Sequence, residues 1–308
     1  MSKEKFLNPD YKPDDNTREE IEKLHKDGES LSGLQLKFAD MKNTKLVNAD
    51  LSHTDLTRAD FSGASMYGVN LEGATLFKTN FEGANLKSAN MKNCNMLGAD
   101  FTNTKLNNID WGINNKVINE IEAEEALAAG DMNTAKEKYA EAEDIYRALK
   151  MSLQAQTLGE DVGKVFIREM IVKRKQMPTF SPIRVMSKIA HISTGYGEKI
   201  GNIFYSIIAV IITCALLYGI DGVTYQDRTL GFFEDDILTY GEGNLFYGYL
   251  RTFGNLFYFS VVVFSTVGFG EITPLGLLNK SVMIVEGLIG GIIMSIIMIA
   301  IYKQLMDR

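Results

Sequence analysis

The chain has 308 residues, of which 45% are hydrophobic, and its formal net charge at pH 7 is −7. This length allows two or three domains, and the acidic balance argues against a nucleic-acid-binding protein. The two cysteines, Cys94 and Cys214, lie in segments of different character, so no disulfide framework is implied.

Residues 1–30 are polar and charged. They contain no apolar run of the kind that marks a cleavable signal peptide. Only the stretch from Thr17 to Lys26, with Ile21 and Leu24, has the apolar spacing of a short helix. We therefore expect an N-terminal tail or cap.

A five-residue repeat follows over residues 31–112. Every fifth residue is large and apolar, and in most units a small residue stands two positions before it. A period of five matches neither the 3.6 of a helix nor the 2 of a strand. It predicts a four-sided coil in which each side buries one large and one small side chain. The large apolar positions are Leu31, Leu36, Met41, Leu46, Leu51, Leu56, Phe61, Met66, Leu71, Leu76, Phe81, Leu86, Met91, Met96, Phe101, Leu106 and Trp111.

The repeat units, such as "ADLSH" and "ADFSG", resemble the pentapeptide-repeat family. The resemblance implies a right-handed quadrilateral β-helix. Residues 31–112 hold eight Lys or Arg and eight Asp or Glu, and this balance argues against the DNA mimicry of some family members. We expect an assembly or regulatory module that binds an unknown cytoplasmic ligand or protein, with Cys94 buried in a small interior position.

Residues 113–200 are rich in Ala, Glu, Lys and Leu. Their apolar positions recur at three- and four-residue steps, and Gly130 and Gly159 are the expected helix stops. We predict an α-helical linker of two or three amphipathic helices packed as a hairpin. The basic stretch "KRKQMPTFSPIR" is interpreted either as a solvated linker or as a segment at an anionic membrane face, and both can hold at once.

Residues 201–308 contain two apolar runs that are long enough to cross a bilayer. The expected outer helix, 203–220, has no charge, and the expected inner helix, 281–302, has one, Glu286. Basic residues precede the first run and follow the second, so we predict a cell-membrane protein with both termini in the cytoplasm. The connecting loop is expected to face outward, and its acidic residues are Asp221, Asp227, Glu234, Asp235, Asp236 and Glu242.

The stretch "FSTVGFGEITP" lies between these two runs. The apolar residues 256–264 are too few to span a bilayer and too hydrophobic for an exposed loop, which predicts a re-entrant segment. Glycine adopts positive φ readily, so Gly268 and Gly270, at alternate positions, let successive carbonyl groups turn to one side. Four such segments around an axis would stack rings of oxygen atoms that replace the water around a cation.

The same stretch resembles the potassium-channel signature, and residues 203–302 resemble the two-span potassium-channel pore. The resemblance implies a homotetramer in the lipid bilayer, with K⁺ as the permeant ion and no other cofactor. It also implies a pore helix, 255–265, that starts near Asn255, followed by a selectivity filter. The filter residues, of which the first four coordinate K⁺, are Thr266, Val267, Gly268, Phe269 and Gly270.

Three positions depart from the commonest form of that signature. Ser265 replaces Thr, Phe269 replaces Tyr and Glu271 replaces Asp. Phe269 lacks the hydroxyl that a tyrosine uses for a hydrogen bond behind the filter, so a less rigid filter is expected. The family pattern places Glu271 beside Tyr258 of the pore helix, and we predict a hydrogen bond between them that supports the filter.

The inner helix contains "EGLIGGIIMS". By spacing from Pro274, Gly290 falls on the hinge glycine of the family, and Gly291 follows it. Close packing of helices through small residues explains the pair equally well. Glu286 is costly in lipid and has to face protein or water. We favour a structural acid that is hydrogen-bonded behind the filter, and the alternative is an acid that biases cation entry.

The sequence thus predicts a multi-domain chain with a pentapeptide-repeat β-helix, an α-helical linker and an all-α two-span pore. The predicted function is a tetrameric potassium-selective channel; the alternatives are a poorly selective cation channel and a membrane-tethered interaction protein with a vestigial pore. No apolar helix carries Arg at three-residue spacing, so no voltage sensor is expected. An enzyme is not expected, because no metal cluster or catalytic triad can be drawn around His25, His53 and His191.

Overall fold

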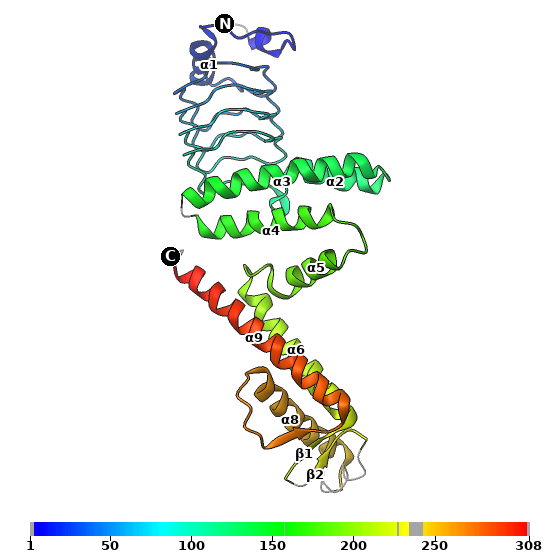
Figure 1. Cartoon of the computed structure of the whole chain (residues 1–308). Helices are drawn as coiled ribbons and strands as arrows, with labels where there is room; N and C mark the ends of the chain where they lie inside the picture. Colours follow the sequence, from blue (N-terminus) through cyan, green and yellow to red (C-terminus); the bar gives the residue numbers. More distant parts are fainter. Residues whose placement is uncertain (1–2, 157, 227, 234–242, 307–308) are drawn as a thin grey trace. The chain divides into compact units, whose positions relative to one another are not determined.

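A computed structural model of the chain describes residues 3–156, 158–226, 228–233 and 243–306. The described residues divide into two compact units, one on each side of the bond between Lys188 and Ile189. Figure 1 shows the elements of both units in chain order. The finer division at residues 30, 112 and 200 stays a prediction.

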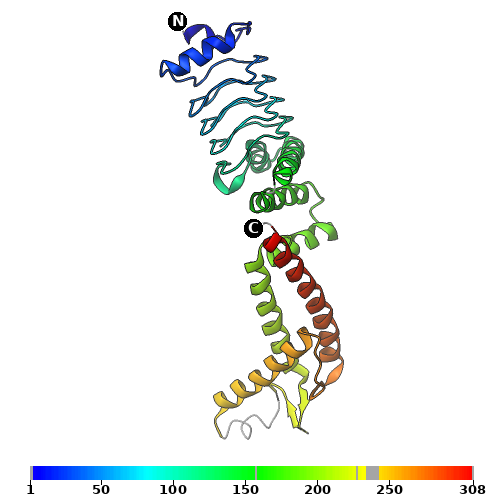
Figure 2. The same cartoon turned by 90° about the vertical axis from the view of Figure 1, so that its left-hand side faces the viewer.

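Residues 35–110 wind into a coil. Its turns are joined by parallel β-bridges between residues 20 apart, from Gln35 with Asp55 to Asn90 with Asp110. One turn therefore holds four five-residue units, and both Figure 1 and Figure 2 show the turns stacked on one another. The β content of the described coil consists of isolated bridges rather than continuous strands.

The chain bends in each unit because the second residue after the large apolar one has a positive φ. This holds for glycine, as at Gly63 (φ 68°), and for other residues, as at Asn43 (φ 55°). Gly and Asn occupy most of these positions, since they adopt the left-handed conformation at the least cost. The five-residue period is therefore set by backbone conformation as well as by the buried side chains.

The interior of the coil is apolar and stacked. The large residues of the repeat are buried throughout, and the rings of Phe61, Phe81 and Phe101 stack with centroids 5.7 Å apart. Offset stacking of this kind adds to the stability gained from burial. Where a small position holds Thr, its hydroxyl has a partner: Thr79 donates to the carbonyl of Leu56 at 2.8 Å.

The N-terminal residues close one end of the coil. They form η1 (Lys3–Leu7) and α1 (Thr17–Lys26). The side chains of Phe6 and Ile21 are wholly buried in the same core as the coil, and the amide of Gln35 donates to the carbonyl of Phe6 at 2.7 Å. These contacts make the segment a cap rather than a loose tail.

Helices close the other end of the coil. Ser152 donates its hydroxyl to the carbonyl of Phe101 at 2.6 Å, and the amide of Leu106 donates to the side-chain oxygen of Gln156 at 3.0 Å. The elements of this region are η2 (Ile113–Asn115), α2 (Ile118–Ala128), α3 (Met132–Ala155), α4 (Gly159–Lys175) and α5 (Pro182–Thr194).

The predicted helix stops have different outcomes. Gly130, with φ 83°, follows the end of α2 as expected. Gly159, which the sequence suggested as a stop, instead begins α4. The preceding helix α3 has already ended at Ala155. The prediction that Gly159 ends a helix was therefore wrong. Helix α3 packs against both α2 and α4.

The second unit is a helical bundle with a small sheet. Its sheet has the order β2-β1-β3, with antiparallel neighbours, and Val223 of β1 pairs with Leu230 of β2 and Pro274 of β3. This sheet corrects the expectation of an all-α pore. The elements are α6 (Ile200–Asp221), β1 (Val223–Tyr225), β2 (Arg228–Leu230), α8 (Leu245–Phe264), β3 (Ile272–Pro274) and α9 (Gly276–Met306).

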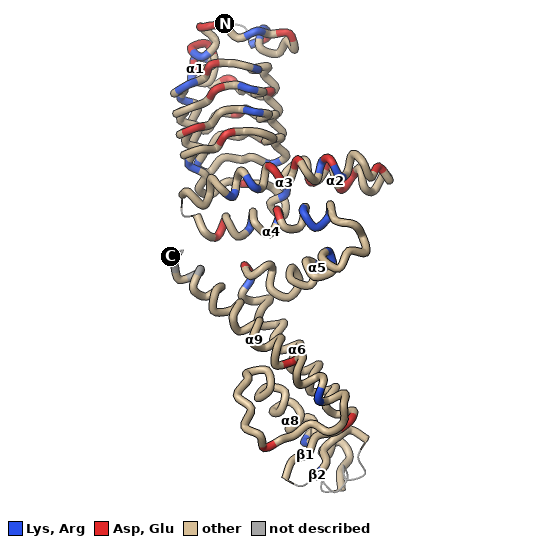
Figure 3. The backbone as a smooth tube through the Cα atoms, in the orientation of Figure 1, with Lys and Arg blue, Asp and Glu red and all other residues tan. Residues whose placement is uncertain are grey.

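Two helices of this unit are long and apolar enough to cross a membrane, α6 over its whole length and α9 from Gly276 to Tyr302. They contain the predicted runs 203–220 and 281–302 and extend beyond both. Figure 3 shows few charged residues along either helix, in contrast to the mixed charges of the coil.

Helix α8 starts earlier than the predicted range 255–265. The side chain of Asn244 accepts a hydrogen bond from the amide of Tyr247 at 3.2 Å and so caps the helix. Asn255 therefore lies inside the helix, not near its start. The predicted acidic loop lies for the most part outside the described residues, namely Asp227, Glu234, Asp235, Asp236 and Glu242.

Candidate functional site

The segment from Thr266 to Gly270 joins α8 to β3 and is neither helix nor strand. Its φ angles are positive at alternate residues: 60° at Thr266, 59° at Gly268 and 76° at Gly270. An ordinary strand keeps φ negative and turns successive carbonyl groups to opposite sides. The alternation therefore distinguishes this backbone from a strand, and the two glycines adopt it without steric cost.

The start of the segment is attached to the end of α8. The amide of Thr266 donates to the carbonyl of Val263 at 2.9 Å, and the amide of Val267 donates to that of Val262 at 3.2 Å. Ser265 donates its hydroxyl to the carbonyl of Val262 at 3.1 Å. Ser265 thus satisfies one of the carbonyl groups that a helix leaves open at its C-terminal end.

The two apolar side chains of the segment are exposed in the single chain. Val267 is 56% exposed and Phe269 is 64% exposed. Their predicted place in the wall around a filter requires further copies of the chain, and it stays a prediction.

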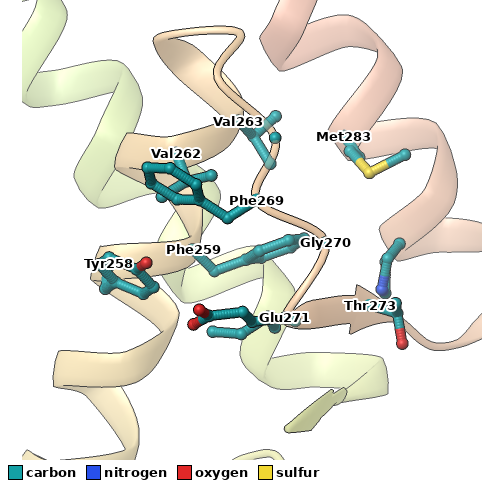
Figure 4. Close-up of a pocket in the computed structure, with 12 residues that line it drawn as sticks. Tyr258, Phe259, Val262, Val263, Phe269, Gly270, Glu271, Thr273 and Met283 are labelled. Carbon is teal, nitrogen blue, oxygen red and sulfur yellow. The ribbon is translucent and has the colours of Figure 1, made fainter.

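Tyr258 and Glu271 line one cavity of about 270 Å³, together with Gly268, Phe269 and Gly270. In Figure 4 the carboxylate end of Glu271 points toward the ring of Tyr258. Both side chains therefore border the same cavity. The predicted hydrogen bond between them is not among the hydrogen bonds of the described residues and stays a prediction. Thr266, Val267 and Ser265 do not line this cavity.

Glu286 is wholly buried, although it lies in the apolar helix α9. Its carboxyl accepts a hydrogen bond from the hydroxyl of Tyr218 in α6 at 2.6 Å. It also contacts the hydroxyl of Ser260 in α8 at a short distance. The contacts tie α9 to both neighbouring helices, which favours the structural interpretation of this acid over a role in cation entry.

Gly290 packs against the end of α8. A Cβ atom at this position would collide with the carbonyl oxygen of Phe264, whereas one at Gly291 would meet nothing within 4 Å. Close packing therefore requires a glycine at 290 and not at 291. A hinge at either residue stays a prediction.

Sequence reasoning missed the partners of these residues. Tyr218, Ser260 and Asn279 are buried polar side chains in or beside apolar helices. Asn279 donates its amide to the carbonyls of Tyr218 and Gly222, at 2.8 and 2.7 Å, and so closes the end of α6. The signal was available, because a polar residue within an apolar helix needs a partner inside the protein. Pairing the three across helices needs the structure.

Among the described residues no cluster of His, Cys, Asp and Glu side chains could hold a metal ion. A cation at Thr266–Gly270 would meet backbone carbonyl oxygen atoms and the hydroxyl of Thr266, which are the oxygen atoms that this stretch of sequence carries. The C-terminal end of α8 precedes this segment, and its partial negative charge favours a cation nearby.

Two stretches of the chain match known families. Residues 35–73 and 70–108 match the pentapeptide repeats, with eight copies. Residues 237–307 match a family described as an ion channel, and this match contains α8, the Thr266–Gly270 segment and α9. No curated protein matches the sequence.

Solved structures of pentapeptide repeat proteins resemble part of the chain. The protein alr5209 from Nostoc is 25% identical over 30% of this chain and 76% of its own length, with a TM-score of 0.27. Rfr23 from the cyanobacterium Cyanothece is 28% identical over 27% of this chain and 59% of its own, with a TM-score of 0.17. HetL from Nostoc is 32% identical over 25% of this chain and 35% of its own length, with a TM-score of 0.17.

The family matches and the apolar helices α6 and α9 lead to one conclusion. The chain carries pentapeptide repeats followed by an ion channel domain, and it is a membrane protein.

Proposed function

We propose that the chain is one subunit of a homotetrameric potassium-selective channel. The observation that carries the proposal is the alternation of positive φ at Thr266, Gly268 and Gly270. This backbone follows helix α8 and lies between two helices that are long and apolar enough to cross a membrane. The match of residues 237–307 to an ion channel family favours transport over an enzymatic function.

The filter works through backbone oxygen atoms. Residues with alternating φ direct their carbonyl groups to one side, and four copies around an axis form rings of oxygen atoms. A K⁺ ion that enters exchanges its water shell for these rings at Thr266, Val267, Gly268 and Phe269. The Thr266 hydroxyl adds a further ring at the cytoplasmic end.

The symmetry of the proposed tetramer accounts for the exposed apolar side chains of the filter segment. Val267 and Phe269 are more than half exposed in one chain, and each would pack against a neighbouring subunit in the tetramer. One chain supplies a quarter of the filter, so the site is incomplete without its copies. Tyr258 and Glu271 would support the filter from the cavity that they share.

The coil is proposed to be the right-handed quadrilateral β-helix of pentapeptide-repeat proteins. The 20-residue turn supports this, because it holds four five-residue sides. By the positive-inside rule both termini, and so the coil, lie in the cytoplasm of a cell-membrane protein. There the coil would assemble or regulate the channel by binding a cytoplasmic ligand or protein.

A poorly selective cation channel is the second candidate. One observation favours it: Phe269 has no hydroxyl to bond to the groups behind the filter. A filter held less rigidly discriminates less between K⁺ and Na⁺, because its oxygen rings adapt to the smaller ion.

The test is ion flux into liposomes that contain the purified full-length protein. Potassium flux that Ba²⁺ blocks, with little Na⁺ flux, is the expected result. Gly268→Ala should abolish the flux, since alanine resists the positive φ. Gly201→Ala is the matched control, because that glycine lies in α6, has space around it and has an ordinary φ.

The other outcomes separate the alternatives. Equal flux of K⁺ and Na⁺ would support the poorly selective channel. A folded tetramer that conducts neither ion, with the coil present or removed, would leave only a membrane-tethered interaction protein with a vestigial pore.

A further inference from the structure

A cluster of buried polar groups joins the three long helices of the second unit. Glu286 of α9, Tyr218 of α6 and Ser260 of α8 are each 0% exposed. The two hydroxyl groups contact different oxygen atoms of the carboxyl group, Tyr218 at Oε2 and Ser260 at Oε1. Ser260 also contacts the backbone carbonyl of Ile211 in α6, at 2.9 Å.

The number of hydrogen atoms available limits how these contacts form. Three oxygen–oxygen contacts link the four groups: Tyr218 with Oε2, Ser260 with Oε1, and Ser260 with the carbonyl of Ile211. A hydroxyl supplies one hydrogen, and a backbone carbonyl supplies none. Ser260 can therefore serve only one of its two contacts as a donor. The other becomes a hydrogen bond only if the carboxyl oxygen Oε1 carries a hydrogen.

Hydroxyl and thiol groups surround the carboxyl, but among the described residues no cation lies beside it to balance a negative charge. The titratable side chains beside the carboxyl are Tyr218 and Cys214, both from α6, and α8 contributes only the Ser260 hydroxyl. Among the described residues no Lys, Arg or His forms an ion pair with it. A buried carboxylate without a cation is strongly disfavoured over the neutral acid.

We propose that Glu286 holds a proton in the folded protein and acts as an uncharged positioning residue of the pore. Tyr218 donates to Oε2, Oε1–H donates to Ser260, and Ser260 donates to the carbonyl of Ile211. Every contact in this chain is then a hydrogen bond. These hydrogen bonds hold α8, whose end carries the Thr266–Gly270 segment, against both α6 and α9. Its functional consequence rests on the proposed channel, whereas the proton itself does not.

The direct test is infrared difference spectroscopy on the full-length protein in liposomes at neutral pH. Subtracting the spectrum of Glu286→Gln from that of the wild type should leave the carbonyl band of one protonated carboxylic acid. Glu137→Gln is the matched control, because Glu137 is exposed on α3, and its difference spectrum should show only carboxylate bands. Carboxylate bands from Glu286 at neutral pH would overturn the inference.

A second variant covers the case in which Glu286→Gln does not fold. Ser260→Ala removes the acceptor of the carboxyl hydrogen, so the band of the protonated acid should shift to the higher frequency of a weaker hydrogen bond. In the wild type alone, that band should persist well above pH of about 4.3, where an ordinary glutamic acid ionises. A band that vanishes near that pH, or that does not move in Ser260→Ala, contradicts the proton chain.

Flux measurements distinguish this inference from the proposed function. Glu286→Gln should conduct like the wild type, because a neutral amide can also accept from Tyr218 and donate to Ser260. Its flux should stay constant at alkaline pH where wild-type flux declines through loss of the proton. If the band of the protonated acid is present but the protein shows no ion flux, the proposed channel function is wrong and the protonation of Glu286 is supported. If the protein shows ion flux but lacks this band, the channel function is supported and the protonation of Glu286 is wrong.

Discussion

At the scale of single residues, several polar groups that lie in the apolar interior of the coil have a partner close by. In the coil, three threonines and Cys94 each lie next to a carbonyl group 23 residues earlier in the chain. Thr104 donates to Phe81 at 2.6 Å, and the thiol of Cys94 donates to Leu71 at 2.9 Å. Half of the units place Ala at the same position, so the interior at these positions accepts either no polar atom or a satisfied one.

Cys94 should be unreactive in the folded protein. Burial raises the pKa of its thiol to about 12, and the thiolate is the form that reacts with alkylating agents. Because the folded pKa lies above the ordinary value of about 8.5, the stability that this shift represents is present below that value and is lost as the pH rises toward 12.

The measurement uses a Cys214→Ala variant, in which Cys94 is the remaining thiol. Alkylation at pH of about 8 should be at least a hundredfold slower in the native protein than in denaturant. Stoichiometric modification under native conditions would show that the small interior position is accessible.

Gly290 and Gly291 form a matched pair at the residue scale. Gly290→Ala should destabilise the protein by about 1–3 kcal/mol, the usual cost of overpacking, because its methyl group would collide with the carbonyl of Phe264. Gly291→Ala has space and should be neutral or stabilising by up to about 1 kcal/mol. Thermal unfolding followed by circular dichroism would measure both. Equal effects of the two substitutions would argue against packing and for a shared hinge.

At the scale of elements, a buried ion pair connects the helices that close the coil. Glu120 of α2 is wholly buried, forms an ion pair with Arg168 of α4 and accepts a hydrogen bond from Tyr146 of α3 at 2.7 Å. Burial, with Glu120 beside it, raises the pKa of Tyr146. Glu120 thus links its own helix, α2, to α3 and α4, just as Glu286 links α9 to α6 and α8 in the second unit.

Arg168→Met should destabilise the first unit by about 3–5 kcal/mol, since it leaves the buried charge of Glu120 without a partner. The double variant Glu120→Gln with Arg168→Met removes both charges and keeps an acceptor for Tyr146, so it should recover most of that loss. Denaturant unfolding of the three proteins gives the comparison. If the double variant is no more stable than Arg168→Met, the loss comes from packing of the arginine side chain rather than from the charge.

At the scale of the whole molecule, the two compact units have separate cores. One core is continuous from the N-terminal cap through the coil into α2, α3 and α4. The second unit has its own buried clusters, formed by α6, α8, α9 and the strands. The coil and its closing helices are thus one folding unit, and a cut between them would expose a buried surface.

Removal of residues 1–181 should therefore leave a pore unit that still folds, assembles and conducts K⁺. Removal of residues 1–112 should give a less stable protein, because the side chains of α3 that face the last turn, such as Leu153, lose their cover. Size-exclusion chromatography and liposome flux of both truncated proteins would test this. If the protein that lacks residues 1–112 is more stable than the one that lacks residues 1–181, the boundary of the folding unit lies at residue 112 instead.

Three features could be recognised in the sequence alone: the five-residue repeat, the two apolar runs and the TVGFG stretch. Each is a local pattern, in which the residues at one place determine the backbone there. The repeat predicted a coil, and its bridges 20 residues apart agree with four units per turn. The early start of α8 was not predicted, because the helix is capped by Asn244 and not by Asn255, where the boundary was expected.

The partners of buried groups could not be predicted in this way. Glu286 was recognised from its cost in an apolar helix, but Tyr218 and Ser260 lie 68 and 26 residues away from it in the chain. Gly290 was placed by family spacing, and its contact with Phe264 appears only when α9 packs on α8. By itself the sequence determined the classes of element, because periodicity and hydropathy act along the chain. Only the tertiary structure decided which buried groups meet, because that depends on the packing of helices far apart in sequence.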